Sequence, residues 1–229
     1  MNVKLVSYSQ PTAEFAELGV DDAQELIAYC ARVSNPANQF NSETSEKLIR
    51  YLVKHQHWSP LEMVSACCEI VTTRDIARQI LRHRSFSFQE FSQRYADPTA
   101  ELDQAFVLRE TRLQDTKNRQ NSVALDMESE DDRFLVAEWQ RRQQEVLELV
   151  KQNYTWAIGA GIAKEQARCI LPEGNTVSRM YMNGTIRSWI HYIMLRKENG
   201  TQKEHADIAL ACAQAIAAIF PMASDMIAT

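Results

Sequence analysis

The stretch RHRSFSFQEFSQRY, residues 82–95, decides how the rest of the chain is organised. It holds three arginines, one histidine and three serines, interleaved with three phenylalanines and a single carboxylate, Glu90. Guanidinium groups suit phosphate oxygens, and serine hydroxyls can complete such a cradle. The phenylalanines would anchor the loop in a core or stack on a planar ring. These residue types favour a site for an anionic ligand.

An arginine-rich segment leads into this stretch. Arg74, Arg78 and Arg82 recur every four residues, so a helix would align them on one face. Residues 74–94 carry five arginines against two carboxylates, a local surplus of three positive charges on a chain of net charge −5. A focused cationic patch on an acidic protein favours a small anionic ligand over a nucleic-acid polymer. On composition alone, a solvated arginine face with its phenylalanines in the core is the favoured interpretation.

The bulk properties bound the class of protein. At 229 residues, 45% hydrophobic and 24% charged, the chain can form one sizeable ordered domain. It has no run of about 18 apolar residues, and its N-terminus lacks the apolar segment of a signal peptide, so we expect a cytoplasmic protein. Its five cysteines are odd in number and show no Cys-x-x-Cys spacing. That pattern is typical of reduced thiols and predicts neither disulfides nor a metal site.

Hydrophobic patterning predicts strands and helices without a regular βαβ repeat. Strands are predicted at residues 3–8, 64–73, 105–108 and 176–182. Helices are predicted at 21–30, from near 42 to the segment 55–60, and at 74–81, 131–156, 163–171, 185–196 and 203–220. Residues 114–130 are predicted to be a polar loop and Gly184 a hinge. The expected fold is α+β, a mixed sheet with flanking helices in a single domain over residues 1–229.

Glycine spacing argues against one common cofactor fold. Gly159-Ala160-Gly161 lacks the third glycine of the Gly-x-Gly-x-x-Gly turn. A Rossmann dinucleotide site is therefore not expected.

Two flanking segments hold further candidate residues. His57-Trp58-Ser59-Pro60 ends a predicted helix, because the residue before a proline is pushed out of helical geometry. Glu165 and Arg168 are three apart and would be neighbours on a helical face. The simplest interpretations are a helix-end histidine and a surface ion pair, which is common and worth little.

The predicted helix at 185–196 is richer in candidates. Arg187 and His191 are four apart and nearly aligned. Arg196 lies five beyond His191, which rotates it by roughly 140° around a helix. The helix could therefore offer Arg187 and His191 to one ligand and Arg196 to another, with solvation of each arginine as the alternative.

The order of these motifs resembles the flavin-dependent thymidylate synthase family. Arg82-His83-Arg84, seven intervening residues, Ser92 and then Arg94-Tyr95 is similar to the signature of that family. Segments 57–62, 165–172 and 185–196 resemble its other motifs and occur in the right order. The resemblance extends over about residues 20–205.

The resemblance implies an enzyme, a methyltransferase of nucleotide biosynthesis. Such an enzyme reductively methylates dUMP to dTMP with 5,10-methylenetetrahydrofolate as the one-carbon donor. FAD is the implied cofactor, and NADPH the implied reductant of the flavin. The resemblance also implies a homotetramer with sites shared between subunits. The net negative charge disfavours a nucleic-acid partner, and the lack of a long apolar run predicts no membrane partner.

The resemblance assigns roles to particular residues of this chain. Arg196 would be the catalytic residue, promoting ionisation of the uracil N3. The expected FAD-binding residues are His57, Ser59, Arg82, His83, Arg84, Glu90, Thr185, Ile186, Arg187 and His191. The expected dUMP-binding residues are Gln79, Ile80, Leu81, Arg82, Glu90, Phe91, Ser92, Gln93, Arg94, Arg168 and Arg196.

Two positions depart from the family pattern. Thr185 stands where asparagine is common, and Met63 stands where a histidine frequently follows the glutamate. Cys169 and Ser92 are nucleophile candidates by position only, since no adjacent base marks either as activated.

Three other functions remain open from the sequence. A nucleic-acid-binding domain could use the face of Arg74, Arg78 and Arg82, and its affinity would fall steeply with salt. A flavoprotein reductase without methyl transfer would oxidise NADPH at a rate that dUMP does not change. A structural protein would bind no cofactor.

Overall fold

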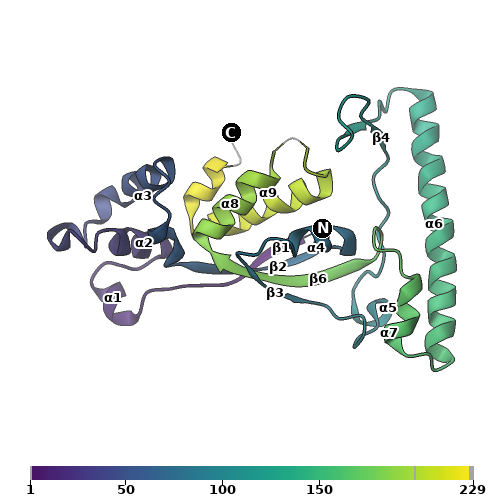
Figure 1. Ribbon diagram of the computed structural model, residues 1–229, viewed down its shortest axis with the longest axis horizontal. Coiled ribbons are helices and arrows are strands. Elements are labelled where there is room, and N and C mark those ends of the chain that lie inside the picture. The colour runs from purple at the N-terminus through teal and green to yellow at the C-terminus, as the bar shows by residue number, and fades with distance from the viewer. Residues whose placement is uncertain (1, 199, 227–229) are drawn as a thin grey trace.

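The computed structural model describes residues 2–198 and 200–226 of the chain. The molecule is elongated, with a sheet at its middle, short helices at one end and the long helix α6 (Glu130–Gly159) at the other (Figure 1). The larger hydrophobic core includes residues of the sheet and of the helices packed on it, and a smaller cluster includes the last turns of α6. Within the described residues, no helix is long and apolar enough to cross a membrane.

Four strands form the main sheet, in the order β1-β2-β6-β3, and all three neighbouring pairs are antiparallel. The strands are β1 (Asn2–Tyr8), β2 (Ser65–Thr73), β6 (Val177–Thr185) and β3 (Ser87–Glu90). Cys68 lies opposite Met182, which lies opposite Phe88, so these side chains form one row against the core. The α+β class is confirmed. The sheet is antiparallel rather than mixed because its neighbouring strands are not joined by the βαβ crossovers that give parallel pairs.

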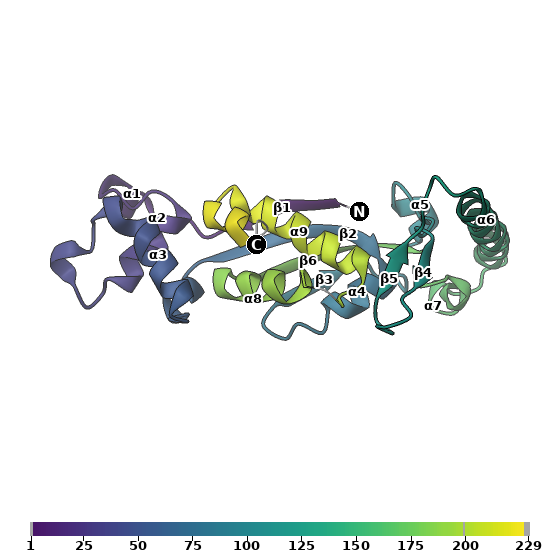
Figure 2. The ribbon, with the colours of Figure 1, turned by 90° about the horizontal axis from the view of Figure 1, so that it is seen from above.

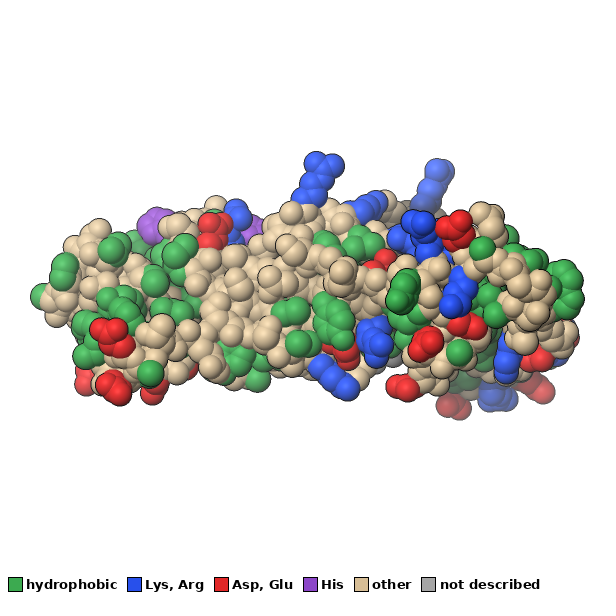
Figure 3. Space-filling model, turned by 90° about the horizontal axis from the view of Figure 1, so that it is seen from below, with side chains coloured by type: hydrophobic (Ala, Val, Ile, Leu, Met, Phe, Trp, Pro, Cys, Tyr) green, Lys and Arg blue, Asp and Glu red, His purple; other side chains and the backbone are tan. Residues whose placement is uncertain are grey.

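A layer of helices covers one face of this sheet. Helices α8 (Ile186–Arg196) and α9 (Lys203–Ala217) lie across it, and α4 (Arg74–Ile80) contacts α9 (Figure 2). Trp189 is buried and donates from its indole nitrogen to the carbonyl of Ala66, 3.0 Å away, which ties α8 to β2. Seen from the opposite side (Figure 3), the Lys and Arg side chains lie mainly over the half of the molecule that carries α6.

A buried polar contact joins two helices at one end of the molecule. Arg32, just after α2 (Ala23–Ala31), donates to Thr44 Oγ1, 3.0 Å away, at the start of α3 (Ser45–Lys54). This contact ties the C-terminal end of α2 to the start of α3. The shorter elements of this end are α1 (Ala13–Glu17) and the 3-10 helices Pro36–Asn38, Ser42–Thr44 and Ser59–Glu62.

Arg109 links three helices at the other end. Its guanidinium donates to Asp75 in α4 and lies 3.3 Å from the Glu204 carboxylate in α9. Its backbone N–H donates to Gln143 Oε1 in α6, 2.8 Å away. One arginine thus connects the long helix to the layer on the sheet. The remaining elements are α5 (Pro98–Glu101), β4 (Arg112–Gln114), β5 (Ser122–Ala124), α7 (Lys164–Ala167) and the 3-10 helices Arg168–Ile170 and Pro221–Met226.

Most predicted elements are confirmed near their expected bounds, but three segments differ. The strand expected at 105–108 is only an isolated bridge, from Phe106 to Thr176. The polar loop expected at 114–130 contributes to the β4–β5 hairpin, and the helix expected at 163–171 is split into α7 and a 3-10 turn. The sequence analysis also missed α1, α5 and β3, because segments of four or five residues show too little periodicity.

Gly184 lies within β6 and is not a hinge, contrary to the prediction. A Cβ built at this position would lie 2.7 Å from Phe86 Cε1. The Phe86 ring packs edge-on against Trp189, with centroids 4.9 Å apart, so it has little room to move. Glycine at position 184 is therefore what allows the loop after α4 to pack on β6.

We expect Gly184→Ala to destabilise the fold by about 1–3 kcal/mol, because the added methyl group must displace the packed Phe86 ring. Thermal and denaturant unfolding would measure the loss. Gly159→Ala is the matched control, since a Cβ built there meets no atom within 4 Å. Equal losses of stability in the two variants would contradict this packing role.

Candidate active site

The centre of the candidate site is a hydrogen bond between residues far apart in the sequence. Arg196, the last residue of α8, donates from Nε to His83 Nε2, 2.9 Å away. The His83 ring stands edge-on against Tyr192, with centroids 4.9 Å apart. An acceptor Nε2 carries no proton, so the proton of the neutral His83 ring lies on Nδ1.

The electrostatics of His83 agree with this arrangement. Burial, followed by the charges of Arg196 and Arg82, lowers the pKa of His83 from 6.5 to about 4. A neutral imidazole orients a guanidinium without cancelling its charge. No carboxylate in the described part of the chain pairs with Arg196, so the full charge of this arginine remains available to a ligand.

Gln79 adds an amide to this cluster. Its Nε2 donates to Gln202 Oε1, 2.7 Å away, and its Oε1 lies 3.2 Å from His205 Nδ1. His205 is completely buried, and its ring centroid lies 6.2 Å from that of His83. The sequence analysis missed Gln202 and His205, because only the packing of α9 against α4 brings them to the site.

Arg82 and Arg84 are exposed, and neither has an acidic partner among the residues that the structure describes. Ile80 differs, because its side chain is completely buried in the core and Leu81 packs beside it. A ligand could reach Ile80 only through its backbone. The segment 79–84 thus combines core residues, two hydrogen-bonded polar side chains and two arginines without a carboxylate partner in the described residues.

Glu90 compensates two arginines of α4. Its carboxylate lies 3.4 Å from Arg74 and 3.6 Å from Arg78, and it accepts a 2.8 Å hydrogen bond from the Ser178 hydroxyl. Arg74 is buried, and burial lowers its pKa even though Glu90 opposes that shift. Two of the three arginines of the face noted in the sequence are therefore ion-paired, and Arg82 alone has no carboxylate partner in the described chain.

The end of the signature contacts α7. Arg94 pairs with Glu165 at 3.3 Å, so the surface ion pair considered for Glu165 and Arg168 is not formed. Arg168 has no carboxylate partner in the segments that the structure covers. Gln93 is buried, and its Nε2 has no hydrogen-bond partner among the described residues. Ser92 and Phe91 lie between these groups, with Ser92 exposed and Phe91 half-buried.

Thr185 is the N-cap of α8. Its hydroxyl accepts from the backbone N–H of Ser188, 3.3 Å away. Threonine can therefore fill the capping role that asparagine would also fill at this position. Ile186 is completely buried, and its backbone N–H is bonded to the carbonyl of Val64.

The segment 57–62 meets α8 through two contacts. Arg187 pairs with Glu62 at 3.2 Å, while its Nε is buried without a partner in the described residues. His191 lies against Trp58, with ring centroids 4.7 Å apart. Burial and then the charge of Arg187 lower the pKa of His191. An exposed serine, Ser59, follows Trp58 at the start of a 3-10 helix.

His57 is exposed and does not join His191. Its ring faces Tyr51, with centroids 6.0 Å apart. Tyr51 also lines an opening of about 540 Å³ between α2 and α3, where Arg32 and Lys47 are the charged lining groups. The sequence analysis did not identify this basic opening, because its residues show no motif.

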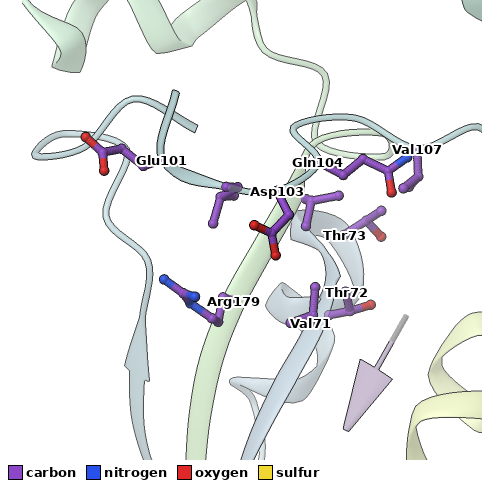
Figure 4. Close-up of a pocket in the computed structure, with 10 residues that line it drawn as sticks. Val71, Thr72, Thr73, Glu101, Asp103, Gln104, Val107 and Arg179 are labelled. Atoms are coloured by element: carbon purple, nitrogen blue, oxygen red, sulfur yellow. The ribbon is translucent and has the colours of Figure 1, made fainter. Parts of the chain in front are cut away.

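A smaller cavity, of about 210 Å³, lies at the end of β2 (Figure 4). Arg179, Asp103 and Glu101 line it together with Thr72 and Thr73. None of the predicted site residues lines this cavity, so we do not assign the site to it.

The fold and the site define a protein whose arginines are arranged for an anionic ligand. Residues 18–222 match the family described as thymidylate synthase complementing protein. The chain is 48% identical over 221 residues to the probable flavin-dependent thymidylate synthase of Paramecium bursaria Chlorella virus 1, and 47% identical over 225 residues to the flavin-dependent thymidylate synthase of Synechocystis sp.. Each match covers 96% of both proteins.

A solved structure is similar over nearly the whole chain. The UMP/dUMP methylase PolB from Streptomyces cacaoi, bound with 5-Br dUMP, is similar with a TM-score of 0.76 and 27% identity. That match covers 99% of this chain and 94% of the PolB chain. The chain belongs to the thymidylate synthase complementing protein family.

The low pKa of His83 makes stability depend on pH. The unfolded chain protonates histidine near pH 6.5 and the folded chain protonates His83 only near pH 4. The contribution of His83 to stability is therefore complete above about pH 6.5 and is lost as the pH falls toward 4. An NMR titration of the imidazole nitrogens should find His83 neutral at pH 6.

Arg196→Met provides the comparison for that titration. The pKa of His83 should rise in this variant, because one of the charges that lower it is gone. The same pKa in both proteins would contradict the contact.

Proposed function

We propose that the chain is a flavin-dependent thymidylate synthase, which methylates dUMP to dTMP. The observation that carries this proposal is the cluster of Gln79, His83 and Arg196, in which a charged guanidinium is held by a neutral ring. Two relatives with 47% and 48% identity bear that enzyme name, and the PolB structure holds a brominated dUMP.

The residues of the site fit FAD, which combines a diphosphate with planar rings. Arg82 and Arg84 are exposed without carboxylate partners in the described chain, and Arg187 Nε is a buried donor without an acceptor. The residues that would hold FAD are His57, Ser59, Arg82, His83, Arg84, Glu90, Thr185, Ile186, Arg187 and His191. When bound, FAD supplies the hydride that reduces the transferred one-carbon unit.

Arg196 would act on the uracil ring of dUMP. A positive charge next to N3 lowers the pKa of that nitrogen, so its proton leaves more readily and negative charge can develop in the ring. The hydrogen bond from Arg196 Nε to His83 leaves the terminal guanidinium nitrogens to face the substrate. This activation of the ring needs no cysteine nucleophile. Cys169 is exposed, and no base among the described residues is hydrogen-bonded to its thiol, so we assign it no role.

The other dUMP-binding residues would hold the nucleotide in place. Ser92, Arg94 and Arg168 offer a hydroxyl and two guanidinium groups, of which Arg168 has no carboxylate partner within the described residues. Arg94 would exchange its exposed pair with Glu165 for the phosphate, which costs little because exposed pairs are weak. The remaining members of the set are Gln79, Ile80, Leu81, Arg82, Glu90, Phe91, Gln93 and Arg196.

The proposal extends to the other substrates and to the assembly. Methylenetetrahydrofolate would donate the one-carbon unit and NADPH would reduce the flavin. The assembly would be a homotetramer with shared sites, and α6 offers an apolar surface for contacts between subunits, since Phe134, Val146, Leu149 and Trp156 are each more than half exposed. Residues 1–229 would act as one domain, in keeping with a family match from 18 to 222. A cytoplasmic location is in keeping with the five free cysteines.

The rival functions have less support. A nucleic-acid site on the face of Arg74, Arg78 and Arg82 would need three available cations, but Arg74 is buried and both Arg74 and Arg78 lie near Glu90. A reductase without methyl transfer would have no use for a charged group held as Arg196 is.

The absorption spectrum of the protein tests this proposal. We expect the wild type to retain a flavin band through gel filtration after incubation with FAD, and dUMP to perturb that band. Arg82→Ala should weaken flavin retention by about tenfold or more, because a charge-assisted contact to a phosphate is lost.

Arg142→Ala is the matched control, since Arg142 is exposed on α6 and pairs only with Glu138 in the described residues. A wild type that retains no flavin would refute the proposed function. Equal retention by the Arg82 and Arg142 variants would remove Arg82 from the site.

A further inference from the structure

The side chain of His205 makes one hydrogen bond in the described residues. It is completely buried in α9, and its Nδ1 lies 3.2 Å from Gln79 Oε1 in α4. Its other nitrogen, Nε2, has no hydrogen-bond partner within the described chain. The ring also lies near Tyr192, with centroids 5.8 Å apart. A buried imidazole whose one hydrogen-bond partner in the described residues is a glutamine can set the orientation of that glutamine's amide group.

The direction of the hydrogen bond between His205 and Gln79 is set by Glu204, at the other end of a chain of hydrogen bonds. Glu204 is a carboxylate, which can only accept, and Gln202 Nε2 donates to its Oε2 at 3.0 Å. Gln202 must then turn its Oε1 toward Gln79, whose Nε2 donates to it at 2.7 Å. Gln79 Oε1 is therefore left facing His205, and only a protonated Nδ1 can donate to it. The carboxylate is itself held by Arg109, 3.3 Å away.

The charge state of His205 fits this direction. Burial, followed by the charges of Arg196, His83 and Arg82, lowers the pKa of His205 from 6.5 to about 3. The ring is thus neutral, with its one proton required on Nδ1. The lone pair of Nε2 is left in a buried environment that offers it no donor among the described residues.

We propose that His205, together with Glu204, is a positioning residue that fixes the donor and acceptor ends of the Gln79 amide for a pyrimidine nucleotide. This inference rests on the proposed function, in which Gln79 contacts dUMP. One N–H and one oxygen lone pair of Gln79 remain unused by the chain. The edge of a pyrimidine base alternates carbonyl and N–H groups. An amide can pair with that edge only when its own donor and acceptor ends are held in one orientation.

The tautomer of His205 tests the hydrogen-bond direction without any ligand. We expect ¹⁵N NMR of protein labelled at its five histidines to show His205 with the proton on Nδ1 at pH 7. The signal is assigned by its loss in His205→Leu. Glu204→Gln removes the acceptor-only group, so both tautomers of His205 should then be populated. A proton on Nε2 in the wild type, or an unchanged tautomer in Glu204→Gln, would overturn the proposed direction.

Binding of dUMP tests the positioning role. In FAD-loaded protein, His205→Leu should raise the Kd for dUMP about fivefold, the effect of one hydrogen bond of ordinary strength. His205→Asn offers an amide N–H near the position of Nδ1 and should stay within about twofold of the wild type. Flavin retention should be the same in all three proteins.

The outcomes separate this inference from the proposed function. Equal affinities in the leucine and asparagine variants would show that His205 only fills space. A wild type that binds FAD but not dUMP would refute both the proposed function and the nucleotide part of the inference, while the tautomer measurement would still decide the hydrogen-bond direction. If His205→Leu does not fold, Glu204→Gln takes its place, with the same expected rise in Kd.

Discussion

A guanidinium that donates to a neutral imidazole is the contact on which the candidate site depends. A carboxylate in place of His83 would hold Arg196 as firmly but would cancel its charge. His83 stays neutral because the helices over the sheet bury it, beside Tyr192 and near His205, and its pKa falls to about 4. The packing that stabilises the helical layer therefore also keeps the charge of Arg196 available to an anion.

The presence or absence of a carboxylate partner divides the arginines of the predicted site region into two groups. Arginines of the predicted site region that have a carboxylate partner in the described residues are Arg74, Arg78, Arg94 and Arg187. Those without one, over the same residues, are Arg82, Arg84, Arg168 and Arg196. Paired arginines hold strands, helices and loops together. The unpaired arginines are the groups that a bound nucleotide or flavin would neutralise. The sequence alone does not distinguish the two groups of arginines.

Much of the fold could be predicted from the sequence, because long periodic segments such as 131–156 and 64–73 determine their own structure. The short strand β3 and the role of Gly184 could not, since both depend on contact with β6. For the candidate site, the signature predicted Arg82 and His83, the resemblance of segment 185–196 predicted Arg196, and the fold brings His83 and Arg196 into contact. His205 shows the limit most clearly. It stands in no motif, and only the packing of α9 on α4 brings it to Gln79.

The most direct measurement is the formation of dTMP from dUMP by the purified protein supplied with FAD, NADPH and methylenetetrahydrofolate. The wild type should form dTMP, and omission of any one component should stop the reaction. Arg196→Ala should fold normally and lose about 100-fold or more in rate, as expected when a charge that stabilises a transition state is removed, whereas Arg142→Ala should match the wild type. Product formation by Arg196→Ala at nearly the wild-type rate would contradict the central role of the charge that His83 holds in place.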